Sequence, residues 1–170
     1  MKKTFIGIFV VSCTVFLALA WAGTKKATEA PKMEAPGAEG AAVYTHITTV
    51  SKYQDWDLWP GKEKMYKGQP PHGAFLTTYI NKEAKSAIDA KKVTGPGAII
   101  VKENYSPEKR LAAVTVMYKV AGYNTEANDW FWAKYKADGT VEKEGKVAGC
   151  INCHAAKKAN DFVFTSEFVK

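Results

Sequence analysis

The chain has 170 residues, of which 46% are hydrophobic and 24% charged, so its length and composition fit one folded domain with appended segments. Its formal net charge is +7, yet the lysines are spread along the chain and interleaved with acidic residues. That distribution indicates a solvated surface and argues against nucleic acid as a partner.

The first residues have the layout of a secretory signal peptide. Lys2 and Lys3 precede a nearly unbroken apolar run over 4–20, and Ala20-Trp21-Ala22 forms a small-x-small cleavage site. We therefore predict a signal peptide over 1–22 and a periplasmic protein. The apolar run is just long enough to serve instead as an uncleaved membrane anchor, which is the less favoured alternative.

Cleavage of this signal peptide would simplify the cysteine content. Cys13 would be lost, which leaves Cys150 and Cys153 as the only thiols of the mature chain. No framework of several disulfide bonds, as small exported domains often use, can be built from them. Cleavage would also remove two lysines and no acidic residue, and so lower the net charge from +7 to +5.

The composition changes sharply after residue 42. Residues 23–42 are rich in Ala, Glu, Pro, Gly and Lys and contain almost no large apolar side chain, so we predict a flexible linker. Aromatic residues become frequent from Val43 onward. We place one folded domain over 43–170, a length that allows one modest hydrophobic core.

Three helices are predicted in this domain. Tyr and Trp side chains at a spacing of three predict an amphipathic helix over Thr49–Trp59 that ends at Pro60-Gly61. A second helix is predicted over Asn81–Lys92, with Asn81 as its N-cap. A third helix is predicted from Gly149 onward.

The remaining elements are predicted strands, with β-branched and aromatic residues alternating between turn signals. These strands are Gly73–Ile80, Ala98–Tyr105, Leu111–Val120, Asp129–Tyr135 and a short return strand at Thr140–Glu142. Phe162–Phe168 would add a terminal strand or extended segment. The order predicts an α+β fold, with a largely antiparallel sheet of about four to five strands, flanking helices and the chemistry-bearing motif near the C-terminus.

That motif is Cys150-Ile151-Asn152-Cys153-His154, the attachment sequence of a c-type haem. Residues three positions apart share one face of a helix, so Cys150 and Cys153 can present both thiols to the two haem vinyl groups. His154 follows directly and can bind the iron as the proximal ligand. We therefore predict one covalently bound haem c.

Two other readings of this motif fit less well. Zinc needs about four ligands, and the chain has no second pair of cysteines. A redox-active Cys-x-x-Cys pair would be expected in a βαβ unit near the start of an early helix. Haem is the favoured cofactor.

The sixth coordination position of the iron has no obvious ligand. No Met follows Cys153, and Met117 lies in a strand pattern, where it is more readily explained as core packing. His46 is expected at the surface. His72 lies in a loop before a strand and could cap a haem face, although such a histidine is more often structural or solvated. We expect a five-coordinate iron with an open position.

Lys102 is the second residue of interest. Period-two alternation along Ala98–Asn104 puts Lys102 on the face of Ala98 and Ile100, and Glu103 on the other face. A strand leaving the core, with its last charged side chains reaching water, explains this pattern as well as a functional role does.

Aromatic residues are concentrated in Trp130–Tyr135. Trp130 and Trp132 would share one face of a strand, with Phe131 and Tyr135 on the other, so both faces are expected to be covered. Core packing is the favoured role. Rings that could also line a haem pocket are those of this strand together with Phe75 and Tyr79.

The combination resembles the cytochrome P-460 family and its relatives, the β-type cytochromes c-prime. The matching stretches are Leu58-Trp59-Pro60-Gly61, His72–Tyr79, Gly97–Glu103, Asp129-Trp130-Phe131-Trp132, Gly149–His154 and Asp161-Phe162-Val163-Phe164. The resemblance implies an α+β fold, covalent haem, a proximal histidine and an open distal site. By resemblance alone, a homodimer is also expected.

The resemblance also implies a role for Lys102. P-460 proteins cross-link a lysine of the corresponding Val-Lys-Glu strand to the haem and oxidise hydroxylamine, with nitric oxide as a ligand on the way. The β-type cytochromes c-prime lack the cross-link and bind nitric oxide without comparable turnover. Electrons would leave to a redox-partner cytochrome.

This chain departs from a complete catalytic site in one respect. Hydroxylamine oxidation sheds protons and needs a nearby base, yet Ala155 and Ala156 follow His154. Glu103, Asp129 and Glu144 could relay protons, but surface salt bridges are the favoured explanation for them. Whether the protein is an enzyme, a non-catalytic nitric oxide-binding cytochrome or a simple electron carrier therefore stays open.

Overall fold

The computed structural model describes residues 35–170. The predicted signal peptide and most of the predicted linker lie outside the described residues. Within 35–170, no helix is both long enough and apolar enough to cross a membrane.

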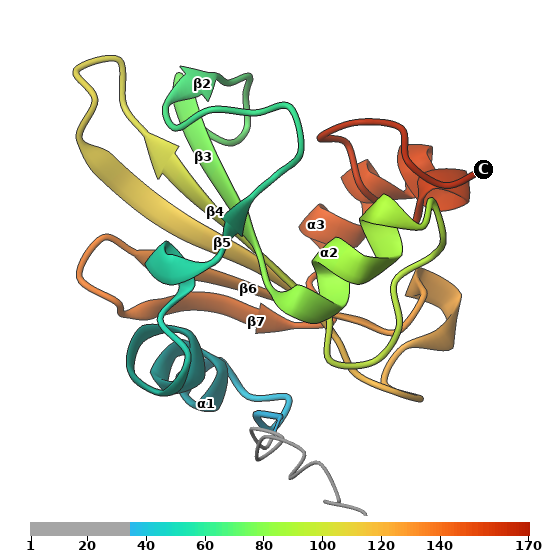
Figure 1. Cartoon of the computed structure of the whole chain (residues 1–170). Helices are drawn as coiled ribbons and strands as arrows, with labels where there is room; N and C mark the ends of the chain where they lie inside the picture. Colours follow the sequence, from blue (N-terminus) through green and yellow to red (C-terminus); the bar gives the residue numbers. More distant parts are fainter. Residues whose placement is uncertain (1–34) are drawn as a thin grey trace, which may run out of the picture. The chain divides into compact units, whose positions relative to one another are not determined.

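The centre of the domain is a seven-stranded antiparallel sheet, which confirms the predicted α+β class (Figure 1). Its strands are β1 (Asp57–Leu58), β2 (Tyr66–Lys67), β3 (Phe75–Ile80), β4 (Ile99–Tyr105), β5 (Leu111–Lys119), β6 (Trp130–Lys136) and β7 (Val141–Gly145). The spatial order is β1-β3-β4-β5-β6-β7, and β2 also pairs with β3. The five longer strands are the predicted ones, and the two-residue strands β1 and β2 are additional.

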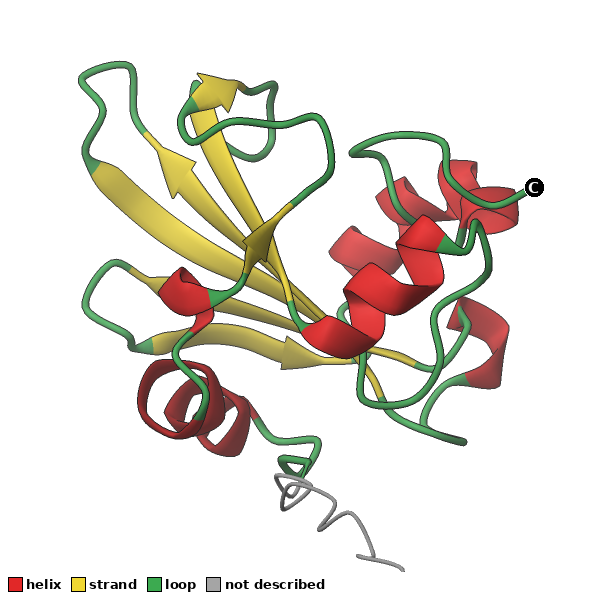
Figure 2. Cartoon of the chain, in the orientation of Figure 1, coloured by secondary structure: helices red, strands yellow, loops and turns green. Residues whose placement is uncertain are grey.

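Helical segments flank the sheet (Figure 2). They are α1 (Gly40–Thr45), the π-helical turn His46–Val50, α2 (Lys82–Asp89), α3 (Ala148–His154) and 3₁₀ turns at Tyr53–Asp55, Thr125–Ala127 and Ala155–Asn160. Helix α1 begins inside the segment assigned to the linker. The cap of α2 is as predicted: Asn81 Oδ1 accepts a hydrogen bond from the backbone N–H of Ala84 at 3.0 Å.

The predicted helix over Thr49–Trp59 is wrong. Helical structure ends at Val50, and the rest of the segment is a 3₁₀ turn followed by β1. The aromatic residues that suggested one helical face pack in different places, because Tyr53 and Trp56 join one hydrophobic cluster and Trp59 joins another. The spacing of three residues therefore does not reflect one face of a helix. The aromatic side chains belong to an irregular segment at the edge of the sheet and pack into two different clusters.

The two faces of the sheet carry separate hydrophobic clusters. On one face, which we call the helical face, Ile100, Met117, Trp130 and Trp132 pack against α2 and the C-terminal segment. The other buried residues of this cluster include Ile80, Ala98, Phe162, Val163 and Phe168. The other, the N-terminal face, packs against α1 and the π-helical turn; its members include Val43, Ile47, Tyr79, Val101, Val116, Phe131 and Tyr135. The predicted alternation of β4 and β6 is thus confirmed.

Candidate functional site

Helix α3 carries the Cys-x-x-Cys-His motif, as predicted. The backbone N–H groups of Cys150 and Ile151 both donate to the carbonyl of Val147 at 3.0 Å, which forms the first turn. Cys150 is half-buried against the helical face, whereas Cys153 is exposed, and both thiols are free. Burial raises the pKa of the Cys150 thiol.

The imidazole of His154, the last residue of α3, is held in a defined orientation. Only 8% of the residue is exposed, and its Nδ1 lies 2.6 Å from the backbone carbonyl oxygen of Phe162. A carbonyl only accepts, so Nδ1 carries the proton and the neutral ring has its lone pair on Nε2. Burial lowers the pKa of His154, and the positive charge of Lys102 lowers it further. A neutral imidazole fixed through Nδ1 is the form that binds metals.

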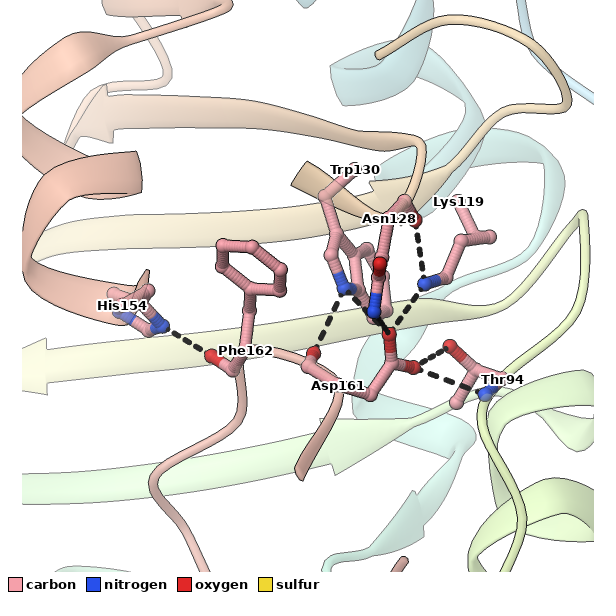
Figure 3. Close-up of polar contacts among 7 residues, drawn as sticks. All are labelled: Thr94, Lys119, Asn128, Trp130, His154, Asp161 and Phe162. Carbon is pink, nitrogen blue, oxygen red and sulfur yellow. Dashed lines mark hydrogen bonds and ion pairs between the residues drawn. The ribbon is translucent and has the colours of Figure 1, made fainter. Parts of the chain in front are cut away.

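The carbonyl that orients His154 lies in a sharp turn of the chain. Asp161 and Phe162 both have left-handed backbone conformations, with φ of 54° and 63°. The Asp161 side chain is fully buried and anchors this turn (Figure 3). Its Oδ2 accepts hydrogen bonds from the backbone N–H of Thr94 at 2.9 Å and from the Thr94 hydroxyl at 2.6 Å.

A buried ion pair completes this anchor. Lys119 Nζ lies 2.7 Å from Asp161 Oδ1, and the two side chains are 4% and 0% exposed. Lys119 also donates to the carbonyl of Asn128 at 2.7 Å and lies 4.0 Å from the centre of the Trp130 ring. The Trp130 indole donates to the Asp161 carbonyl at 2.9 Å. We call Thr94, Lys119, Asn128, Trp130 and Asp161 the Asp161 cluster.

The Asp161 cluster is hard to predict from the sequence. Lys119 ends an otherwise apolar strand, and Asp161 stands out only through the resemblance, as the residue that precedes Phe-Val-Phe. The two lie 42 positions apart in the sequence. No local pattern pairs them.

Lys102 lies on the helical face of β4, between Thr78 of β3 and Thr115 of β5. It is partly buried, and burial lowers the pKa of its amine to about 8. The residues that follow, Glu103 and Asn104, are both buried. The alternative in which the strand leaves the core at Lys102 is therefore wrong.

His72 lies close to His154. Its ring centre lies 6.1 Å from that of His154, with the two planes at 85°. His72 Nδ1 lies 2.9 Å from Asn104 Oδ1. Burial lowers the pKa of His72 to about 4, with a further contribution from the charge of Lys102. The positive charge of Lys102 thus lowers the pKa of both histidines.

Aromatic side chains surround His154. Trp132 lies 4.8 Å and Phe164 5.3 Å from the His154 ring, measured between ring centres. The indole Nε1 of Trp132 is buried without a hydrogen-bond partner, which costs about 1–3 kcal/mol if it stays unpaired. Phe75 and Tyr79 do not contribute, because Tyr79 belongs to the N-terminal face and Phe75, four positions earlier on the same strand, shares that face.

The three carboxylates considered as relays lie elsewhere. Glu103 is buried on the N-terminal face and accepts hydrogen bonds from the hydroxyls of Tyr53 at 2.9 Å and Tyr105 at 2.7 Å. Asp129 accepts from backbone N–H groups in a turn, and Glu144 accepts from a backbone N–H at 2.7 Å. The expectation of surface salt bridges for them is wrong.

These residues fit a covalently attached haem. Two thiols lie three positions apart on one helix, a neutral histidine keeps Nε2 free, and a buried indole donor could pair with an acceptor such as a haem carboxylate. Among residues 35–170, no three Cys, His, Asp or Glu side chains converge as metal ligands would. The zinc alternative gains no support from this part of the chain.

Comparison with protein-family models gives a match over most of the domain. The family model for cytochrome P460 matches residues 50–165, a span that includes Lys102 and the whole Cys150–His154 motif. A comparison with curated proteins returns no match.

Proposed function

Because the chain belongs to the cytochrome P460 family, we propose that it is an exported mono-haem c-type cytochrome with an open iron site, which oxidises hydroxylamine or binds and processes nitric oxide. Cys150 and Cys153 would hold the haem through two thioether bonds. His154 would bind the iron through Nε2. A haem bound there supplies an iron that binds a small nitrogenous ligand and passes electrons singly to a redox-partner cytochrome.

The observation that carries this proposal is the state of His154. Its Nδ1–H donates a hydrogen bond to the Phe162 carbonyl oxygen at 2.6 Å, so Nε2 is the nitrogen left to bind a metal. A short hydrogen bond to Nδ1 also makes the imidazole a stronger electron donor to the metal it binds. That favours the oxidised state of the iron and so tunes the site electronically.

An open sixth position is supported by the surroundings of Met117. This residue is buried in the hydrophobic cluster of the helical face, paired across the sheet with Ile100 and Trp132. Its thioether is part of the core, as predicted. A simple electron carrier would need another sixth ligand.

Lys102 is proposed to cross-link to the haem edge. With its pKa lowered to about 8, the amine is neutral in an appreciable fraction of molecules near neutral pH, and a neutral amine is a nucleophile. Joining its nitrogen to a ring carbon removes one hydrogen from each partner. The step therefore needs a two-electron oxidant, for which a peroxide is the simplest class.

The second candidate function is non-catalytic nitric oxide binding. The aromatic surroundings of His154 favour it, because Trp132 and Phe164 supply no group that accepts a proton. Cross-linking through Lys102 favours the catalytic alternative. The two functions share the haem, its attachment and the open position.

One experiment separates the functions. The haem-loaded full-length protein would be reduced and its absorption spectrum recorded for wild type, Lys102→Ala and the control Lys134→Ala, a lysine on the same face of the sheet. We expect a red-shifted band, different from that of an ordinary c-type haem, in wild type and Lys134→Ala alone. An ordinary spectrum in all three, changing when nitric oxide is added, would favour the second function.

Turnover provides the complementary measurement. Hydroxylamine and an electron-accepting cytochrome or dye would be mixed with the same three proteins, and reduction of the acceptor would be followed. We expect turnover in wild type and Lys134→Ala and a large loss in Lys102→Ala. A low-spin spectrum that is indifferent to both ligands would refute the open iron site.

Export and assembly complete the proposal. A periplasmic location predicts that the mature protein starts after residue 22, which mass spectrometry of a periplasmic extract would measure. A chain that keeps residues 1–22 in the membrane fraction would favour the anchor alternative. Light scattering of the purified protein tests the proposed homodimer.

A further inference from the structure

We propose that Glu103 and the tyrosines around it form a redox site on the N-terminal face of the sheet, where a tyrosine gives up an electron while its proton passes to the carboxylate. The role of this site is to remove oxidising equivalents when a peroxide reacts at the haem. The inference rests on the proposed function, because it takes peroxide at an open iron site as the oxidant.

Two tyrosine hydroxyls converge on the Glu103 carboxylate. Tyr53 donates to Oε1 at 2.9 Å and Tyr105 donates to Oε2 at 2.7 Å, so each carboxylate oxygen has its own donor. Tyr79 lies beside them, with its ring centre 5.2 Å from that of Tyr53. Glu103, Tyr53 and Tyr79 are buried, whereas Tyr105 is partly exposed. These four residues, which we call the Glu103 cluster, therefore reach from the core to the surface.

Stability alone does not account for a carboxylate at this position. Glu103 is 6% exposed, and none of the ion pairs among residues 35–170 includes it, whereas the buried Asp161 is paired with Lys119. A carboxylate buried without a cation loses its hydration, and hydroxyl donors restore only part of that free energy. An apolar side chain among these hydrophobic neighbours would avoid the loss. The retained carboxylate therefore indicates a chemical role.

A carboxylate is the partner that a tyrosine needs in order to be oxidised. Burial and the neighbouring Glu103 raise the pKa of both Tyr53 and Tyr105 above the ordinary value of 10, so both phenols carry their proton at neutral pH. A phenol that loses an electron becomes a strong acid, and the electron leaves more easily when a base takes the proton in the same step. Glu103 is such a base, because both hydroxyls already donate to it.

The Glu103 cluster shares strand β4 with Lys102. Lys102 and Glu103 are consecutive, so they lie on opposite faces of the same strand, and a haem joined to Lys102 would be linked covalently to the strand that carries Glu103. Tyr105 ends this strand, and Gly73 lies against its backbone: a Cβ on Gly73 would lie 2.6 Å from the carbonyl oxygen of Tyr105 and 2.7 Å from its nitrogen. Only glycine allows this close approach, which holds Tyr105 in place.

The electrons and protons of this step balance. Each tyrosine gives up one electron and one proton and becomes a neutral tyrosyl radical. The proton passes to Glu103, which becomes a neutral carboxylic acid. Hydrogen peroxide takes up two electrons and two protons and becomes two molecules of water, so its reduction oxidises two tyrosines. A soluble reductant that reaches the partly exposed Tyr105 returns one electron and one proton for each radical.

The tryptophans of the helical face are poorly suited to the same step. Trp132 lies 4.8 Å from His154 between ring centres, but its indole N–H has no acceptor that could take the proton. Trp130 lies 4.0 Å from the Lys119 ammonium group, whose positive charge opposes a positive charge on the ring. The Glu103 cluster therefore supplies what these rings lack, an oxidisable ring with a base already hydrogen-bonded to it.

The test mixes the oxidised, haem-loaded full-length protein with hydrogen peroxide and freezes samples at set times for electron paramagnetic resonance. We expect a tyrosyl radical in wild type that forms about a hundredfold more slowly in Glu103→Gln, which keeps every tyrosine and removes only the base. Tyr118→Phe is the control, because the buried Tyr118 hydroxyl donates to the backbone carbonyl of Pro36 at 2.9 Å; it should behave as wild type. A radical that forms equally fast in Glu103→Gln would overturn the proposal.

Two further variants keep the test valid if Glu103→Gln folds poorly. Tyr53→Phe and Tyr105→Phe each remove one hydroxyl and keep the ring. We expect each to lower the radical yield or to change the hyperfine pattern, which depends on the orientation of the oxidised ring; spectra unchanged in both would overturn the proposal. Radical formation in wild type should also be slower in heavy water, because the proton moves with the electron, and equal rates in the two solvents would overturn the coupled step.

Failure of this inference can be told apart from failure of the proposed function. If the iron binds nitric oxide and reacts with peroxide but no tyrosyl radical forms, the open iron site stands and the redox site is refuted. If the iron is indifferent to every ligand, the open site is refuted, and a photo-oxidised ruthenium complex in solution replaces peroxide as a one-electron oxidant. A tyrosyl radical that depends on Glu103 then supports the redox site, and one that does not overturns it.

Discussion

Replacing Asp161 by Asn would remove the charge that balances Lys119 while keeping the shape of the side chain. Asp161 is fully buried and Lys119 is 4% exposed, so the Lys119 ammonium would stay desolvated without a counter-charge, beside neutral partners such as the Asn128 carbonyl and the Trp130 ring. Breaking a buried ion pair from one side costs about 3–5 kcal/mol. For a domain of this size, the midpoint of thermal unfolding should fall by roughly 10–20 °C.

A double-mutant cycle isolates the ion pair from its surroundings. Lys119→Met should be comparably destabilising, because it leaves the Asp161 carboxylate buried without its cation. The double variant should lose far less than the sum, since neither charge then remains unpaired. Thermal unfolding followed by circular dichroism measures all three. Asp89→Asn, which removes the exposed Lys85–Asp89 pair, is the control and should change nothing measurable.

The same variants should also alter the iron ligand. The Asp161 cluster fixes the turn that aims the Phe162 carbonyl at His154 Nδ1. A looser turn weakens that hydrogen bond, makes the imidazole a poorer donor and so favours the reduced iron. We expect a higher reduction potential and a lower iron–histidine stretching frequency in Asp161→Asn. Stability and potential unchanged from the Asp89→Asn control would refute this account.

Three further predictions concern other parts of the domain. Burial and the charge of Glu103 raise the pKa of Tyr79 to about 12 from the ordinary value of 10. As the pH rises, the unfolded chain releases this proton first, so the free energy of unfolding should fall between pH 10 and 12 by roughly 2–3 kcal/mol. Ultraviolet titration should show a lower Tyr79 pKa in Glu103→Gln, and an unchanged value would contradict the assignment. Gly73→Ala should shift the loop that carries His72 and lower the unfolding midpoint, whereas Gly95→Ala, where a Cβ meets no atom within 4 Å, should not; equal midpoints would contradict the close approach. Replacing both Cys150 and Cys153 by Ser should let acidified organic solvent extract the haem that wild type retains, and haem still covalently bound in that variant would contradict the thioether assignment.

The parts of the fold that could be predicted from the sequence are those set by local patterns. The strands β3 to β7 follow from period-two alternation between turn residues, and the N-terminus of α2 follows from Asn81, whose side chain caps it. The Cys150–His154 motif is local as well. In each case the signal lies within about ten residues and needs no knowledge of the partner.

The parts that could not be predicted depend on distant partners. Strands β1 and β2 are two residues long and exist because β3 offers its edge to both. The position of the His72 side chain depends on a hydrogen bond to Asn104, which lies 32 positions away, and that of Asp161 depends on its ion pair with Lys119. A loop histidine and a terminal aspartate are unremarkable in a sequence, because their burial is decided by tertiary packing.

The pleat of β4 explains how Lys102 can be an available amine in a strand that also carries a carboxylate. Lys102 and Glu103 are adjacent, but consecutive residues of a strand point to opposite faces. Glu103 is therefore hydrogen-bonded to tyrosine hydroxyls on the N-terminal face, and burial alone, with no carboxylate to oppose it, sets the lowered pKa of Lys102. A carboxylate beside Lys102 would instead have held it as an ammonium ion, which is no nucleophile. Because the two residues are adjacent in the strand, the carboxylate of Glu103 and the amine of Lys102 lie on opposite faces of the sheet, and the amine stays available as a nucleophile.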